Sequence, residues 1–453
     1  MRLGTMLTGA ALSALLAGGA FAVQASPQAA PQPVPVPVPV TAAPVPSASL
    51  LPGTQALFDS YVADRKMPGI VGAFGMGDLP TVFVSAGHIS NDPGAASAGP
   101  DSLWRVYSMT KPITAMAAMI LIQDGKMTLD EPISDFIPAF KNMRVQLNEN
   151  TLDSRPATRP ITVRNLLTHT AGLGYNIITK GPLLDDYNKH GITPGAINAQ
   201  FEAQMRPARP TSLAEFADRV AAEPLIADPG TKWSYSIGLD LMGAVIEKAS
   251  GMPFDRFVQT RILDPLKMNS TYWTVPQSEA GRLATNYTFV GGAMLPVDPG
   301  VGSLWLKPPS FPYGGAGLVM SARDYDRFLH MLQDGGTLDG VRVMKPETVA
   351  LAMSNLLPPG VEFGGAVANT GGQTTGPKMG FGAGGSVILE SVPGGPSKGT
   401  YGWGGAAGTI AWVDPARHAR GTVMVNYFPG EQWPLRADVG KALFADMARY
   451  GQQ

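Results

Sequence analysis

The alternation of apolar and polar positions predicts β-strands near both ends of the chain. Residues 69–75 and 81–86 are apolar and partly β-branched, and the Gly-Asp-Leu-Pro sequence between them predicts a hairpin. Three more strands are expected at 387–390, 408–413 and 422–426. The pattern therefore predicts one antiparallel sheet that combines N-terminal and C-terminal strands.

Apolar residues at helical spacing predict helices on either side of this sheet. The expected helices cover approximately residues 54–62, 108–123, 239–249, 324–332 and 435–450. Long connections rich in glycine and proline join the central ones, so we expect a mostly helical lobe at approximately 125–320, inserted between the sheet-forming parts. The expected fold class is thus α+β, an α/β sandwich with helices flanking the sheet.

One connection, residues 174–210, is long and rich in proline, asparagine and glycine. Such a stretch is either a disordered surface excursion or a lid over a site, and we favour the lid.

The first 53 residues have the composition of an export signal and a tether. Arg2 precedes an apolar run at 7–21, and small-residue cleavage patterns follow it, which indicates a signal peptide at 1–25. A permanent anchor is the alternative, but the run is short for a spanning helix. Residues 26–53 are proline-rich and predict a semi-rigid linker. We expect a bacterial periplasmic or secreted protein whose domain covers 54–450, without stable membrane insertion after cleavage.

Composition narrows the chemistry further. Charged residues make up 15% of the 453 residues and the formal net charge is -1, so nothing favours a nucleic-acid partner, and a small ester or amide substrate is easier to accommodate. The absence of cysteine excludes disulfides, thiolate nucleophiles and Cys-ligated zinc. The five histidines, at 88, 169, 190, 330 and 418, lack metal-ligand spacing, so no metal or cofactor is expected.

Two serines compete as candidate nucleophiles. Ser397 lies in Gly-Pro-Ser-Lys-Gly, a formal match to the Gly-x-Ser-x-Gly elbow, but its flanks are rich in glycine and proline. Neither the strand before nor the helix after that an elbow requires can form there, so a turn is the better interpretation. Ser108 instead opens an apolar helical pattern as Ser108-Met-Thr-Lys111.

The spacing of three places Ser108 and Lys111 on one helix face, within reach of a hydrogen bond. The start of a helix favours negative charge on Ser108, and burial would lower the pKa of Lys111 so that it can accept a proton. On this motif alone, however, a capped and solvated helix start is the commoner meaning.

Two further segments change that balance. Tyr235 lies in a turn-rich stretch just before the predicted helix at 239–249, where it is either a core-edge residue or a proton shuttle beside a cation such as Lys111. The segment Tyr401-Gly-Trp-Gly-Gly-Ala-Ala-Gly-Thr409 precedes a predicted strand, and its glycines let backbone N–H groups approach a substrate. A glycine-rich bulge with a packing tryptophan is the structural alternative.

Taken together, these segments resemble the serine β-lactamase and penicillin-binding-protein superfamily, in particular its class C-like branch with the β-lactamase-like (family VIII) carboxylesterases. Ser108-x-x-Lys111 resembles the first motif, Tyr235-Ser236 the second and Trp403-Gly404-Gly405 the third, in the required order. Other familiar landmarks are 166–173, 229–231, 246–251 and 315–321. The similarity spans nearly the whole predicted domain.

The resemblance implies a role for each motif residue. Ser108 would be the nucleophile, Lys111 and Tyr235 the general acid/base pair, and the amides of Ser108 and Ala406 the oxyanion hole. An acyl-enzyme would form and then hydrolyse. His169 would be a structural landmark and not a triad base.

Two departures from the family pattern concern the substrate. Ile237 stands where β-lactamases of this branch generally carry an asparagine, and Trp403 replaces the lysine or histidine that opens the third motif. Loss of that cation weakens recognition of a carboxylate, while the indole adds apolar surface. We therefore expect Ile237, Trp403, Gly404 and Gly405 to contact an ester substrate. The alternatives are a β-lactamase or D-alanyl-D-alanine peptidase, or a covalent binding protein without turnover; a purely structural or adhesive role is least favoured.

Overall fold

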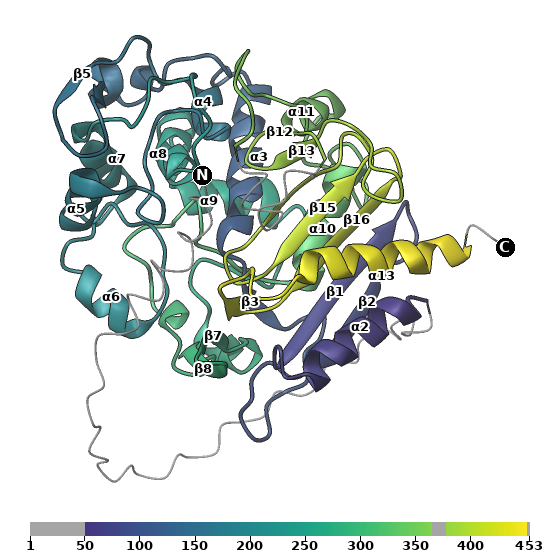
Figure 1. Ribbon diagram of the computed structural model, residues 1–453. Helices are drawn as coiled ribbons and strands as arrows, with labels where there is room; N and C mark the ends of the chain where they lie inside the picture. Colours follow the sequence, from purple (N-terminus) through teal and green to yellow (C-terminus); the bar gives the residue numbers. More distant parts are fainter. Residues whose placement is uncertain (1–49, 365–376, 451–453) are drawn as a thin grey trace, which may run out of the picture.

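A seven-stranded antiparallel sheet forms the centre of the computed structural model, which describes residues 50–364 and 377–450 (Figure 1). The predicted signal peptide at 1–25 and nearly all of the predicted linker at 26–53 lie outside these residues. In spatial order the strands are β12 (Met379–Phe381), β13 (Ser386–Ile388), β14 (Tyr401–Gly404), β15 (Ile410–Asp414), β16 (Ala419–Met424), β1 (Gly69–Met76) and β2 (Val82–Gly87).

The two ends of the chain meet in this sheet, as the sequence predicts. The hairpin pairs Val71 of β1 with Ser85 of β2, while on the other side Val71 pairs with Met424 of β16. The expectation of a mixed helix and sheet fold with an antiparallel sheet is confirmed. One strand differs: the segment beginning at Tyr401 does not merely precede a strand but itself forms β14, because its glycines fit beside the close backbone of β15.

Helices cover both faces of the sheet (Figure 1). The α-helices in the described residues are α2 (Pro52–Ala63), α3 (Thr110–Gln123), α4 (Val163–Leu167), α5 (Gly181–Lys189), α6 (Ala199–Met205), α7 (Leu213–Ala222), α8 (Gly238–Ser250), α9 (Phe254–Val258), α10 (Ala322–Gln333), α11 (Pro346–Ala352) and α13 (Leu435–Tyr450). Because side chains alternate along a strand, Ile70 and Phe74 pack beneath α2 and α13, whereas Val71 and Ala73 face the larger core that contains α3 and α10.

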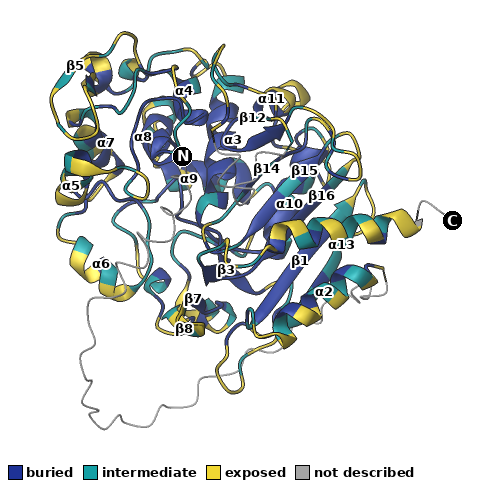
Figure 2. Ribbon diagram, viewed as in Figure 1, coloured by how far each residue is buried: buried dark blue, intermediate teal, exposed yellow. Residues whose placement is uncertain are grey.

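Helix α3 is buried along nearly its whole length. Every residue from Thr110 to Leu121 is buried, in agreement with a sequence that is apolar on all sides (Figure 2). By contrast, α2 and α13 expose an outer face to solvent (Figure 2). The first of these begins at Pro52, two residues before the predicted domain start at 54, because proline is well suited to the first turn of a helix.

The segment at 125–320 holds more than helices. It also contains the short strands β4 (Arg144–Gln146), β5 (Ser154–Pro156), β6 (Thr271–Tyr272), β7 (Asn286–Val290) and β8 (Ala293–Asp298). A further strand, β9 (Val319–Ser321), lies at the end of the segment. The remaining strands are β3 (Leu103–Arg105), β10 (Thr337–Leu338), β11 (Val341–Arg342) and β17 (Tyr427–Phe428). Residues 174–210, expected to be irregular, include α5 and α6. Proline and asparagine hide the helical pattern in the sequence, but here Pro182 lies in the first turn of α5 and Asn198 caps the N-terminus of α6.

No helix among the described residues combines the length and the apolar character that crossing a lipid bilayer requires.

Candidate active site

Ser108 lies in a tight turn at the entrance to α3. The turn is a 3-10 helix at Tyr107–Met109, and α3 itself starts at Thr110, two residues later than the predicted helix start. The side chain of Ser108 is partly exposed, whereas its neighbours Tyr107 and Met109 are buried. The serine hydroxyl is therefore held at the boundary between core and solvent, where a substrate can reach it.

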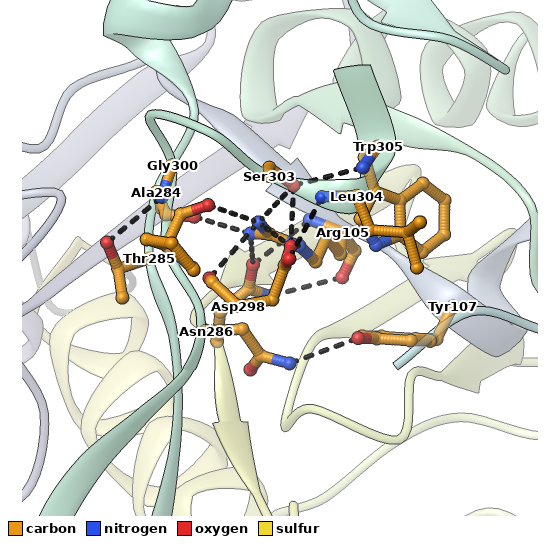
Figure 3. Close-up of polar contacts among 12 residues, drawn as sticks. Arg105, Tyr107, Ala284, Thr285, Asn286, Asp298, Gly300, Ser303, Leu304 and Trp305 are labelled. Atoms are coloured by element: carbon orange, nitrogen blue, oxygen red, sulfur yellow. Dashed lines mark hydrogen bonds and ion pairs between the residues drawn. The ribbon is translucent and has the colours of Figure 1, made fainter. Parts of the chain in front are cut away.

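A buried polar network anchors the strand that leads into this turn (Figure 3). Arg105, the last residue of β3, is fully buried and its Nε donates to Asp298 Oδ2 at 2.9 Å. The side-chain amide of Asn426 bonds both the N–H and the C=O of Arg105, each at 3.1 Å. Asn286 Nδ2 donates to the Tyr107 hydroxyl at 3.0 Å. These contacts fix the backbone on the N-terminal side of Ser108.

Lys111 is fully buried one helical turn after Ser108. Its Nζ donates to Ser108 Oγ at 3.2 Å and to the backbone oxygen of Gly315 at 2.8 Å. The ammonium position also lies 4.6 Å from the ring centroid of Tyr235 and 5.5 Å from that of Tyr175. The amine thus faces the serine inside a largely aromatic enclosure.

Tyr235 approaches the same serine from the segment that precedes α8. Its hydroxyl donates to Ser108 Oγ at 2.7 Å, so Ser108 Oγ receives hydrogen bonds from both Tyr235 and Lys111. The structure therefore brings Tyr235 next to Ser108 and Lys111, although Tyr235 is more than 120 residues away from them in sequence. Either partner is within the distance at which a proton can pass to or from the serine oxygen.

A carboxylate that the sequence analysis did not single out lies beside this group. Asp240, in the first turn of α8, is fully buried and its Oδ1 accepts the N–H of Gly315 at 2.8 Å. Gly315 consequently links Asp240 to Lys111, because its carbonyl accepts from Lys111 Nζ. Burial raises the pKa of Asp240 to about 6, an effect that the charge of Lys111 partly opposes.

The third motif lies on β14 and in the turn that follows it. Trp403 is almost entirely buried, with its ring centroid 5.8 Å from that of Tyr235 and 5.2 Å from that of Phe381. Gly404 and Gly405 are partly exposed and Ala406 is exposed. A Cβ at Gly405 would lie 2.5 Å from the carbonyl oxygen of Val106, so only glycine lets this turn pack against the turn that carries Ser108.

Ile237 departs from its predicted role. Its side chain has no exposed surface and packs in the main core at the start of α8, so the structure does not support a direct contact of this side chain with a substrate. Burial of the apolar Ile237 side chain in the core is more favourable in free energy than exposure to solvent beside Tyr235. The sequence did not reveal to which side of the turn this side chain points.

Arg436, at the start of α13, is a cation that sequence reasoning missed. A Cβ at Gly404 would lie 2.7 Å from its Nη2, so the guanidinium occupies the space beside the third motif that a side chain at 404 would need. The signal in the sequence is only a lone arginine some thirty residues after Trp403. Its position depends on how α13 packs, which local patterns do not show.

Ser397, the competing serine, lies in the connection between β13 and β14. It is mostly buried, and its N–H donates to Asp414 Oδ2 at 3.0 Å. The next described helix after it is α13, far along the chain, so this serine has the setting of a turn and not of a nucleophile elbow.

One group with metal-ligand chemistry occurs among residues 50–364 and 377–450. Asp78, His330 and Asp334 offer ligand atoms that lie within 4.8 Å of one another, at the β1–β2 turn and the end of α10. This group corrects the expectation of no metal-ligand spacing among the histidines: His330 and Asp334 are four apart on α10, and Asp78 joins them only in the folded chain. None of the three belongs to the elements that carry Ser108, Lys111 or Tyr235.

Comparison with known proteins shows the family to which this chain belongs. A model of the family described as Beta-lactamase matches residues 54–443. Protein Rv1367c of Mycobacterium tuberculosis is 33% identical over 70% of this chain and 75% of its own length, and esterase EstB of Burkholderia gladioli is 29% identical over 89% of this chain and 98% of its own.

Among solved structures, simvastatin synthase (LovD) from Aspergillus terreus superimposes with a TM-score of 0.74 at 23% identity, covering 90% of this chain and all of that one. This similarity concerns the fold. Together with the match to nearly the whole described chain, these findings show that the protein is a serine hydrolase that belongs to the β-lactamase family.

Proposed function

We propose that the protein hydrolyses carboxylic esters through an acyl-enzyme on Ser108, with Lys111 and Tyr235 as the acid/base pair. The observation that carries the proposal is the convergence of Lys111 Nζ and the Tyr235 hydroxyl on Ser108 Oγ, at 3.2 and 2.7 Å. A partly exposed hydroxyl with two proton-exchanging neighbours is the arrangement that nucleophilic catalysis requires.

In the first half of the reaction, Ser108 Oγ attacks the ester carbonyl carbon while its proton passes to the unprotonated member of the Lys111–Tyr235 pair. The resulting oxyanion accepts hydrogen bonds from the backbone N–H groups of Ser108 and Ala406, and each such donor is worth about 3 kcal/mol. The C–O bond to the alcohol then breaks, and the pair returns the proton to the alcohol oxygen. Water repeats these steps on the acyl-enzyme and releases the acid.

Esters are favoured over β-lactams because of the residue at the head of the third motif. Trp403 places an uncharged indole next to Tyr235, where enzymes of this superfamily that act on β-lactams or D-alanyl peptides carry a cation. With Trp233, Phe363 and Phe381 it forms an aromatic cluster in which Trp233 is partly exposed, and such apolar surroundings suit the apolar part of an ester. The similarity to esterase EstB supports the same assignment.

The proposal is tested with p-nitrophenyl butyrate and nitrocefin on purified protein and on the matched variants Ser108→Ala and Ser397→Ala. We expect turnover of the ester, little turnover of nitrocefin, loss of at least a thousandfold in kcat for Ser108→Ala and nearly unchanged kcat for Ser397→Ala. Preferred turnover of nitrocefin would indicate a β-lactamase, and a stoichiometric burst without turnover would indicate a covalent binding protein. An active Ser108→Ala variant would refute the mechanism.

We also propose that the enzyme acts in the bacterial periplasm or outside the cell, on the basis of the signal-like sequence at 1–25.

A further inference from the structure

The segment that carries Tyr235 is hydrogen bonded along its length to the loop that follows α4. Backbone bonds of 2.7–3.2 Å connect residues 226–237 to residues 169–174. His169 belongs to this set, because its carbonyl oxygen accepts the N–H of Ser234 at 2.9 Å. Among these contacts, His169 is distinctive in that its side chain also takes part.

The imidazole of His169 is held by the residue on the other side of Tyr235. His169 Nδ1 lies 3.2 Å from the backbone nitrogen of Ser236 and 3.0 Å from its hydroxyl. A backbone N–H can only donate, so Nδ1 must be the acceptor and the proton of the neutral ring must be on Nε2. Ser236 Oγ in turn accepts the N–H of Gly238 at 3.3 Å, which leaves its own proton for Nδ1.

The ring is also locked against the tyrosine itself. His169 is fully buried, and its ring meets that of Tyr235 edge-on at a centroid distance of 4.8 Å. Burial and the nearby charge of Lys111 lower the pKa of His169 well below its usual value, so the ring stays neutral and Nδ1 stays an acceptor.

We propose that His169 is a positioning residue for Tyr235: its carbonyl oxygen and its Nδ1 bind the N–H groups on either side of Tyr235 and so hold the phenol hydroxyl against Ser108. The inference rests on the proposed function, in which Tyr235 exchanges a proton with Ser108. Since a displacement of about 1 Å can cost a hundredfold in rate, loss of the Nδ1 contact is expected to lower kcat with little effect on KM.

Two substitutions separate the two ring nitrogens. In His169→Asn the amide oxygen can occupy the place of Nδ1, whereas in His169→Gln it reaches the place of Nε2 and leaves the Ser236 N–H without its acceptor. The backbone at 169 has φ +56°, which asparagine also tolerates better than most residues. We expect His169→Asn to retain kcat within about threefold and His169→Gln to lose about thirtyfold or more, with KM within twofold in both.

Glutamine at position 169 must adopt the left-handed backbone conformation, which also destabilises the loop. A second measurement therefore separates an effect on folding from an effect on the position of Tyr235. An active-site fluorophosphonate labels Ser108, so the final stoichiometry counts folded sites and the labelling rate reports the reactivity of the hydroxyl. We expect full stoichiometry for both variants and a labelling rate that is reduced only in His169→Gln. The inference would be overturned if both variants kept the labelling rate and kcat of the unsubstituted protein. It would also be overturned if both variants lost labelling rate and kcat to the same extent.

The pH profile gives a further check. Because the ring is neutral throughout, His169→Asn should keep the shape of the kcat profile, and disappearance of an inflection would instead identify His169 as a titrating acid or base. Tyr235→Phe distinguishes the two levels of the argument. If it stays active, the proposed function fails; if it is inactive while the two His169 variants behave alike, only the positioning role fails.

Discussion

Removal of the carboxylate of Asp298 should destabilise the protein strongly. Asp298 Oδ2 accepts from the Nε of Arg105 at 2.9 Å and from the Ser303 hydroxyl at 2.5 Å, and Oδ1 accepts the N–H of Leu304 at 3.0 Å (Figure 3). The two charged side chains are 0% and 2% exposed. Asp298→Ala therefore leaves a guanidinium buried without its counter-charge, which costs about 3–5 kcal/mol.

That cost can be converted into a melting temperature. A domain of about 400 residues has an unfolding entropy near 0.8 kcal/mol/K, so a loss of about 4 kcal/mol lowers Tm by about 5 °C. Differential scanning calorimetry measures this shift. The matched control is Asp130→Ala, which also removes the carboxylate partner of an arginine, bound at 2.7 and 2.8 Å, but at a site where the aspartate is 72% exposed.

For the exposed pair we expect a cost below about 1 kcal/mol and a shift of about 1 °C or less. If Asp298→Ala melts within 1 °C of the unsubstituted protein, or if the two variants shift equally, the argument that burial sets the cost is refuted.

Three further predictions follow. Tyr235→Phe should lower kcat for p-nitrophenyl butyrate by 10²–10⁴-fold, since it removes one proton-exchanging partner of Ser108; a loss below fivefold would contradict this. Because the pKa of Asp240 is raised to about 6, its contribution to stability falls as the pH rises from about 4 through 6. Calorimetry should therefore show that Asp240→Asn gains Tm relative to the unsubstituted protein at pH 8 but not at pH 4, and an equal difference at both would argue against a titrating Asp240. Incubation with EDTA should leave esterase activity unchanged, and a loss restored by a divalent metal would show that metal binding contributes.

Local patterns were sufficient to predict the elements that carry the chemistry. The hairpin at 69–87 and the helix after Ser108 follow from apolar spacing, and the run from Thr110 to Leu121 is apolar enough to show that α3 is buried. The fold could be predicted because three motifs in a fixed order identify the family, and members of one family share a fold. The same motifs made it possible to predict that Ser108, Lys111 and Tyr235 lie together.

Contacts set by tertiary packing were not predictable in this way. No local pattern in the sequence indicates on which side of the turn Ile237 lies. Nor does one indicate that Arg436 occupies the space beside Gly404. His169 is a similar case, because its partner Ser236 is 67 residues away and nothing near either residue indicates the pairing. For residues 174–210 only the expected irregularity was wrong, because short helices with proline and asparagine at their starts resemble loops in composition; the lid stays a prediction.

The pairing of β1 with β16 has a consequence for biosynthesis. Val71 of β1 can pair with Met424 of β16 only after Met424 has been synthesised. At roughly 5–20 residues per second the ribosome needs on the order of 20–70 s to make the chain between them. During that interval the N-terminal hairpin presents an unpaired edge, which is a template for aggregation. A transcript cut short before β16 should therefore yield an insoluble product and not a smaller working enzyme.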